Sequence, residues 1–207
     1  MPRLASIDPP WDQRLARVLV RPLRNGRVTP NGITTLTLIL GLLSAWLYAR
    51  GGSAAHLGAV LFMLACLLDH ADGELARLSG RTSTFGHYYD LIADGLVLTA
   101  LFLGIGAGLS GGEAGAGALR LGLLAGGATG LIVLLRLELE RRAGRSATRQ
   151  PNLLGFELQD LMYLVGPVTW LGWLEPFLIL AAIGAPLYAL NVLWTLGRHL
   201  QRAGSPL

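Results

Sequence analysis

Six apolar segments recur along the 207 residues of this chain, and each is a candidate membrane span. A helix rises about 1.5 Å per residue, so roughly 20 apolar residues cross the hydrocarbon core of a bilayer. Only 14% of the residues are charged and 52% are hydrophobic, whereas a soluble domain carries about a quarter charged residues. This composition excludes soluble, collagen-like and disordered chains and predicts an all-α, polytopic membrane protein. The six predicted transmembrane helices cover residues 33–49, 54–68 with a polar continuation, 90–109, 118–135, 161–171 and 176–196.

The basic residues predict how the chain is oriented. All 17 are arginine, and 15 of them flank the predicted spans on one side, leaving only Arg50 and Arg120 opposite. Cytoplasmic loops are enriched in basic residues near the ends of spans, so both termini and that side of the bundle are predicted to be cytoplasmic, in a bacterial or archaeal inner membrane. The arginines adjoin apolar runs and not a polar face interleaved with aromatics, which favours lipid headgroups or phosphates as partners over nucleic acid.

An amphipathic segment precedes the first span. Its apolar residues recur at helical spacing behind Pro9 and Pro10, so residues 9–28 are predicted to form a helix lying in the membrane interface. A flank without fixed structure is the alternative. The spans are closely spaced, and residues 1–207 are therefore predicted to be one membrane-embedded domain with its six-helix bundle at 33–200.

Four aspartates lie where the second span ends and the third begins: Asp69, Asp72, Asp90 and Asp94. Each pair shares one helix face, because the spacings are i, i+3 and i, i+4. Two antiparallel helices joined by the Leu78–Tyr89 loop would bring all four carboxylates together at the cytoplasmic end of the bundle. Salt bridges to Arg77 and Arg81 are the alternative use of these acids.

Clustered carboxylates in a low-dielectric site repel one another unless cations neutralise them. An all-oxygen ligand set suits magnesium, manganese or calcium better than zinc. Two such metals can clamp a phosphate, stabilise a leaving group and assist an attacking hydroxyl. The aspartates therefore indicate a divalent metal pair that supports displacement at phosphorus.

The residues from Asp69 to Asp94 follow the pattern D-x-x-D-G-x-x-A-R-x8-G-x-x-x-D-x-x-x-D at every fixed position. This pattern resembles the signature of the CDP-alcohol phosphotransferase family, and Thr29–Thr34 is similar to the family's P-N-x-x-T segment. The resemblance implies displacement of CMP from CDP-diacylglycerol by a small polar alcohol, two Mg or Mn ions, and a homodimer. It assigns the metals to Asp69, Asp72, Asp90 and Asp94, with Asp94 also the general base. It assigns the CDP moiety to Gly73, Arg77, Gly86, Asn31, Thr34 and Ser83.

The acceptor is less constrained by the sequence. Family members that use inositol phosphate grip its phosphate with basic residues on later helices, and the matching candidates here are Arg136, Arg145, Arg149 and Arg198. Arginines at these positions are also expected from the enrichment of basic residues in cytoplasmic loops, without any role in acceptor binding. Small-residue stripes at Gly104 and Gly108 and at Gly122, Gly126 and Gly130 indicate close helix contacts or a dimer seam.

Two other functions fit parts of this pattern. A CDP-linked small alcohol could instead donate its phosphoalcohol to diacylglycerol, and the motif does not separate the two directions. A divalent-cation transporter is the alternative from another class, because acids inside a membrane also line ion paths. A transporter would distribute its acids across the membrane depth, whereas these four lie near one face.

Overall fold

The computed structural model describes residues 11–24, 26–112, 114–144 and 158–203, and within them it contains helices and no strands. Five helices are long and apolar enough to cross a membrane, and a shorter apolar helix covers Leu161–Trp170. The prediction of an all-α polytopic membrane protein is therefore confirmed. The elements are α1 (Trp11–Val20), η1 (Arg21–Leu23), α2 (Pro30–Arg50), α3 (Gly52–Ser79), α4 (Thr84–Ser110), α5 (Gly115–Ala143), η3 (Leu158–Leu164), α6 (Val165–Trp170) and α7 (Leu174–Ala203).

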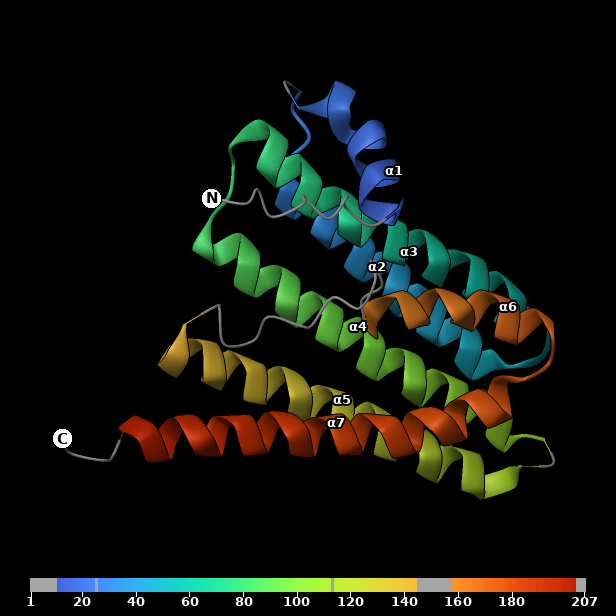
Figure 1. The fold of residues 1–207 in the computed structure, drawn as a ribbon. Coiled ribbons are helices and arrows are strands. Elements are labelled where there is room, and N and C mark those ends of the chain that lie inside the picture. Colours follow the sequence, from blue (N-terminus) through green and yellow to red (C-terminus); the bar gives the residue numbers. More distant parts are fainter. Residues whose placement is uncertain (1–10, 25, 113, 145–157, 204–207) are drawn as a thin grey trace.

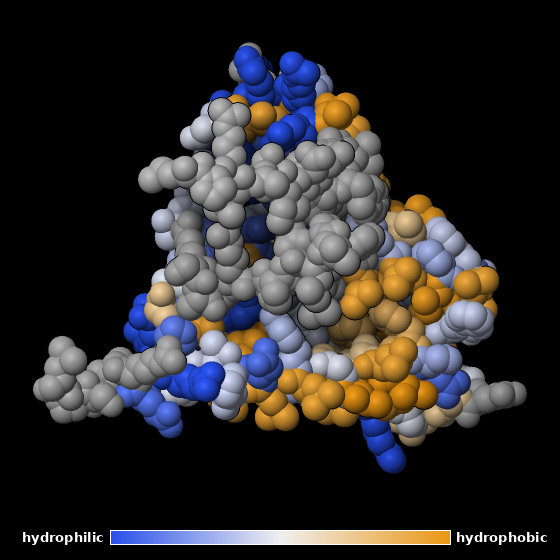
Figure 2. Space-filling view, in the orientation of Figure 1, coloured by the Kyte–Doolittle hydropathy of each residue, from blue (hydrophilic) through white to orange (hydrophobic). Residues whose placement is uncertain are grey.

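The long helices form one bundle, in which α2 packs against α3 and α4, α4 against α5, and α5 against α7 (Figure 1). Its core contains Phe62, Leu101, Ile105 and Leu178, each at most 1% exposed. Leucines and tryptophans cover the outside, as lipid contact requires. Figure 2 shows this apolar surface over α6 and α7 and hydrophilic residues around α1.

The predicted Leu78–Tyr89 loop is mostly helical in the structure. Gly80 ends α3 with a left-handed backbone (φ +67°), a conformation that glycine adopts without steric cost. Ser83 then begins α4, because its Oγ accepts a hydrogen bond from the amide of Gly86 at 2.9 Å. The third span thus starts at Thr84, six residues before the predicted Asp90, and the four aspartates lie inside two continuous helices.

The predicted fifth span is divided between η3 and the short helix α6. Tyr48 on α2 holds α6 in the bundle, since its hydroxyl lies 2.7 Å from that of Thr169. Ten helical residues would cover about 15 Å, roughly half of the hydrocarbon core. This element is therefore shorter than a membrane span within the described residues, which begin again only at 158.

The predicted interfacial helix is present but shorter than residues 9–28. It ends at Val20, before the η1 turn that contains Pro22, which has no amide hydrogen to continue a helix. One face packs on α3, where Ala16 and Val20 are buried beside Ala71 and Leu75. Residues 9 and 10 lie outside the described part of the chain.

The glycine stripes serve helix packing within the chain. A Cβ on Gly122 of α5 would lie 2.6 Å from the backbone oxygen of Phe102 on α4, and one on Gly126 would lie 2.9 Å from that of Thr99. Backbones approach this closely only where side chains are absent. The α4–α5 contact therefore needs these glycines.

We expect Gly122→Ala to lower the thermal stability of the purified protein, because the added methyl overpacks the α4–α5 contact by about 1–3 kcal/mol. Gly127→Ala is the matched control on the same helix, since a Cβ there meets nothing within 4 Å. It should leave the melting temperature unchanged or raise it slightly through better helix propensity. Equal melting temperatures for both variants would show that the close approach is unimportant.

Candidate active site

Three of the four aspartates converge at one end of the bundle. Asp69 and Asp72 on α3 and Asp90 on α4 each offer a carboxylate oxygen, and these oxygens lie within 4.8 Å of one another. The α3–α4 connection is four residues long, so the two helices meet next to the site. Asp72 is buried, whereas Asp69 and Asp90 are partly exposed.

Asp94 lies one turn beyond Asp90 on α4. It lines a cavity of about 30 Å³ together with Asp69, His70 and Tyr163. This volume can hold a water molecule. Asp94 therefore adjoins the three-carboxylate cluster on the side that faces the bundle interior.

The cluster fits a divalent cation by its chemistry. Its ligands are all oxygens, and Asp90 Oδ1 is buried without a hydrogen-bond partner. A buried carboxylate oxygen without a partner is costly unless a ligand binds it. Asp72 and Asp90 form no ion pair with Arg77 or Arg81 within the described ranges, so plain salt bridges do not account for them.

Thr34 on α2 orients one of these ligands. Its hydroxyl donates to Asp72 Oδ2 at 2.5 Å, and both residues are buried. The family resemblance predicts that Thr34 contacts the CDP moiety, whereas in the structure its hydroxyl bonds a carboxylate of the cluster. A hydrogen bond of this kind fixes the direction of the remaining lone pairs.

We expect Thr34→Val to weaken metal binding by about 10–100-fold, because partners of this kind contribute that much to affinity. Thr34→Ser keeps the hydroxyl and is the matched control, with wild-type affinity expected. The measurement is titration of the purified protein with Mn²⁺ followed by electron paramagnetic resonance of the free ion. Equal Mn²⁺ affinity in the two variants would contradict an orienting role.

The other predicted CDP residues form two neighbouring groups. A Cβ on Gly86 would lie 3.0 Å from both Asn31 Oδ1 and Ser83 Oγ, so these three residues meet where α2 and α4 begin. A Cβ on Gly73 would lie 3.7 Å from the Arg77 guanidinium, so the missing side chain leaves that guanidinium accessible. Asn31 lies one turn before Thr34 on α2, and Thr34 bonds Asp72, the residue that precedes Gly73. The group at Asn31 and the group at Gly73 are therefore linked through Thr34 and Asp72.

Arg136 on α5 lies at the level of the aspartates. Val133, three residues before it, contacts Gly95 of α4, and Glu140, four residues after it, bonds His87 of α4. Arg136 is thus on the α4-facing side of α5, between the levels of His87 and Gly95. Its Nε is buried without a hydrogen-bond partner.

The structure does not place the other three acceptor candidates beside the aspartates. The Arg198 guanidinium lies 3.9 Å from the Trp194 ring centroid, and both residues are exposed on α7. Arg145 and Arg149 lie outside the described residues. Whether these three arginines contact an acceptor stays a prediction.

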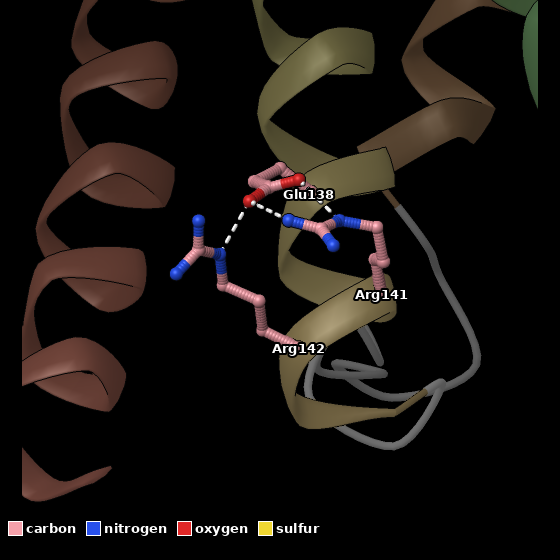
Figure 3. Close-up of polar contacts among 3 residues, drawn as sticks. All are labelled: Glu138, Arg141 and Arg142. Atoms are coloured by element: carbon pink, nitrogen blue, oxygen red, sulfur yellow. Dashed lines mark hydrogen bonds and ion pairs between the residues drawn. The ribbon is translucent and has the colours of Figure 1, made fainter.

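Glu138 is neutralised within its own helix. Both Arg141 and Arg142 donate to its carboxylate, with Arg142 extending toward α7 (Figure 3). All three side chains are at least one-third exposed. Glu138 therefore does not present an uncompensated negative charge.

Sequence reasoning missed several buried polar residues around the site. Glu140 accepts a hydrogen bond from His87 Nε2 at 2.7 Å, and Glu74 binds two arginines. Thr37 Oγ1 is buried without a partner and lines the cavity at Asp94. The i, i+3 spacing of Thr34 and Thr37 in an apolar span could have indicated a polar face on α2. The long-range pairs left no signal in the sequence.

Comparison with known protein families matches residues 27–197 to the CDP-alcohol phosphatidyltransferases. The chain belongs to this family. The matched range includes all four aspartates and every residue predicted to contact the CDP moiety. Family membership identifies the bundle as that of an integral membrane transferase of phospholipid biosynthesis.

Relatives with curated names differ in what they act on. The chain is 43% identical over 68 residues to the "Bifunctional IPC transferase and DIPP synthase" of Thermococcus kodakarensis, covering 33% of this chain and 15% of that protein. It is 30% identical over 105 residues to the "Archaetidylinositol phosphate synthase" of Pyrococcus horikoshii, covering 51% and 54%. It is 30% identical over 82 residues to the "CDP-diacylglycerol--glycerol-3-phosphate 3-phosphatidyltransferase" of Rickettsia felis, covering 39% and 45%. The matched segments thus span at most about half of these relatives.

Proposed function

We propose that this chain transfers a phosphatidyl group from CDP-diacylglycerol to the hydroxyl of a small polar alcohol and releases CMP. The observation that carries the proposal is the convergence of Asp69, Asp72 and Asp90 beside Asp94, at one end of a membrane bundle. A lipid donor in the bilayer and a water-soluble acceptor can meet at such an end. The names of the Pyrococcus and Rickettsia relatives support this reaction class.

Asp69, Asp72 and Asp90 would hold two Mg or Mn ions, with Asp94 contributing to the same centre. When bound, these ions would offset the negative charge of the diphosphate and of the departing CMP. Thr34 keeps the Asp72 carboxylate in place for this role. Arg77, next to the space left by Gly73, would bind a phosphate of the donor, with Asn31, Ser83 and Gly86 close to the nucleotide.

Asp94 would act as the general base. It accepts the proton of the acceptor hydroxyl as the oxygen forms its bond to phosphorus, and the bond from phosphorus to the CMP oxygen breaks with the electron pair leaving on CMP. An alcohol has a pKa far above 7, so this transfer needs the carboxylate to lie close to a site that stabilises negative charge. Asp94 meets that condition because it lies beside Asp69, one of the residues that would hold the metal ions.

We propose further that the acceptor is phosphorylated. Arg136 supports this choice, because a buried guanidinium nitrogen without a partner favours an anionic ligand. Both the relatives' names and this residue favour an inositol phosphate or a glycerol phosphate over a neutral alcohol. Arg145, Arg149 and Arg198 are further candidates to bind the phosphate of this acceptor.

The experiment is CMP release by purified protein in mixed micelles with CDP-diacylglycerol, Mg²⁺ or Mn²⁺, and a panel of inositol phosphate, glycerol 3-phosphate, inositol and serine. We expect release that requires metal and is stimulated by one phosphorylated acceptor. A parallel reaction contains a CDP-linked alcohol and diacylglycerol instead. CMP release only in that reaction would show that the small alcohol carries the CDP group and diacylglycerol is the acceptor. Metal flux in liposomes without any CMP release would support the transporter alternative.

We also propose that the four-aspartate end faces the cytoplasm and that the chain forms a homodimer. The first proposal rests on the 15 arginines that belong to this end of the predicted spans. The second rests on the family resemblance, and since Gly122 and Gly126 are used within the chain, a dimer would employ other surfaces. Cysteine accessibility in inverted vesicles and chemical cross-linking would test the two proposals.

A further inference from the structure

Glu74 is a buried carboxylate inside the aspartate motif that no part of the proposed reaction uses. Its side chain is only 2% exposed, although it lies two residues after Asp72 at the end of a membrane bundle. Arg17 Nε on α1 donates to its Oε2 at 3.1 Å, and Arg77 Nη2 on α3 donates to its Oε1 at 2.8 Å. Each carboxylate oxygen thus binds a guanidinium from a different element.

Burying a carboxylate is costly unless it is paired, so both arginines are held where Glu74 needs them. For Arg77, one turn away on the same helix, the contact fixes a side chain that would otherwise sample many rotamers. The guanidinium keeps further N–H donors beyond the one that Glu74 receives. Arg77 is therefore oriented while it remains able to bind an anion beside Gly73.

Arg17 connects this arrangement to α1. The apolar face of α1 is seated on α3 through Ala16 and Val20, next to Leu75, the residue that follows Glu74. Val18 and Leu19 on the other side are 70% and 49% exposed. The helix thus contacts the motif with one face and presents apolar side chains outward with the other.

We propose that Glu74 is a positioning residue that holds Arg77 for the diphosphate of the donor and couples this arginine to the seating of α1 through Arg17. The proposal rests on the proposed function, in which Arg77 binds the CDP moiety. Arg17, Glu74 and Arg77 together carry one net positive charge. Without Arg17, Glu74 neutralises Arg77, and the attraction of the group for an anionic diphosphate falls.

The test is steady-state CMP release by the full-length protein in mixed micelles, with separate titrations of CDP-diacylglycerol and of the acceptor. We expect Arg17→Gln to raise the donor KM about five- to tenfold, a typical loss for one charge-assisted contact, while kcat and the acceptor KM stay within about twofold. Arg17→Lys should recover part of the affinity because it restores the charge. Arg21→Gln is the matched control, since it removes an exposed arginine from the neighbouring η1 turn.

Glu74→Gln should also raise the donor KM when the variant folds, because Arg77 is released into many rotamers and this loss of positioning outweighs the added net positive charge. Glu74 is buried, so Glu74→Gln could be unstable. Arg17→Gln keeps the proposal testable in that case, because Arg17 is 54% exposed and its loss leaves no cavity. A second readout is amide hydrogen exchange in residues 11–20. It should accelerate in Arg17→Gln and Glu74→Gln and remain at the wild-type rate in Arg21→Gln.

The outcomes separate this inference from the proposed function. If Arg77→Gln leaves the donor KM unchanged, Arg77 does not bind the nucleotide, and the assignment on which the inference rests fails. If Arg77→Gln raises the donor KM but neither Arg17→Gln nor Glu74→Gln does, the proposed function stands and the coupling is overturned. A uniform loss of kcat and of both affinities, with a lower melting temperature, would show a structural role only and would also overturn it.

Discussion

Asp94→Asn is expected to reduce metal-dependent CMP release by about 10²–10⁴-fold, the range that a general base contributes. The amide has nearly the volume of the carboxyl group, so the variant should fold, and the cavity shared with Asp69 should persist. It cannot accept the acceptor's proton at an ordinary pH. The measurement is the rate of CMP release at saturating donor and acceptor.

Glu175→Gln is the control that shows whether the loss of a carboxylate outside the site lowers activity. This exposed residue lies in the first turn of α7, near the start of α3 and away from the aspartates, and its variant should have wild-type activity. Asp94→Glu retains a base but displaces it, so a partial recovery over Asp94→Asn is expected. Asp94→Asn activity within about threefold of wild type would remove Asp94 from the role of base.

Asp90→Asn should raise the melting temperature of the metal-free protein and abolish its stabilisation by Mg²⁺ or Mn²⁺. Three carboxylates whose oxygens lie within 4.8 Å of one another repel by about 3.5 kcal/mol per charged pair at that separation and an effective dielectric constant of 20. Neutralising one of them relieves part of that repulsion. The same change removes a ligand, so the metal no longer favours the folded state.

For the wild-type protein, metal at about 100 times its dissociation constant should raise the melting temperature by roughly 5–10 °C, and a chelator should reverse the shift. Glu138→Gln is the matched control, because Glu138 lies on α5 with its own arginine partners and outside the cluster (Figure 3). It should keep the full metal-dependent shift. A full shift in Asp90→Asn would contradict metal binding by the cluster.

CMP release and the metal-dependent shift in melting temperature together distinguish the role of Asp94 from that of Asp90. If Asp94 serves mainly as the base, Asp94→Asn loses activity and keeps most of the metal-dependent shift. If Asp94 is chiefly a ligand, the variant loses both. Asp90→Asn should lose both in either case, since Asp90 belongs to the three-carboxylate cluster.

The site itself could be predicted because its residues are local in sequence. Asp69 and Asp72 share one helix face by spacing alone, as do Asp90 and Asp94, and the short connection forces the two helices together. Element boundaries were less well predicted. The start of α4 depended on the Ser83 cap and the Gly80 turn, whose hydrogen bonds outweighed the polar character of residues 84–89.

The contacts that support the site could not be predicted in the same way. Thr34 meets Asp72 across 38 positions, His87 meets Glu140 across 53, and Arg17 meets Glu74 across 57. Each pair depends on the rotation of one helix against another, which the packing of many small side chains determines together. A single sequence contains no periodicity that reports such a pairing.

The sequence by itself determined the membrane bundle and its acidic end, because hydropathy and the spacing of the aspartates are read along one helix at a time. Only the tertiary structure decided which groups hold those acids in place. It assigned Thr34 to a carboxylate, joined α1 to the motif through Glu74, and used Gly122 for packing within the chain. These outcomes follow from close contact between distant segments, where burial makes every polar group require a partner.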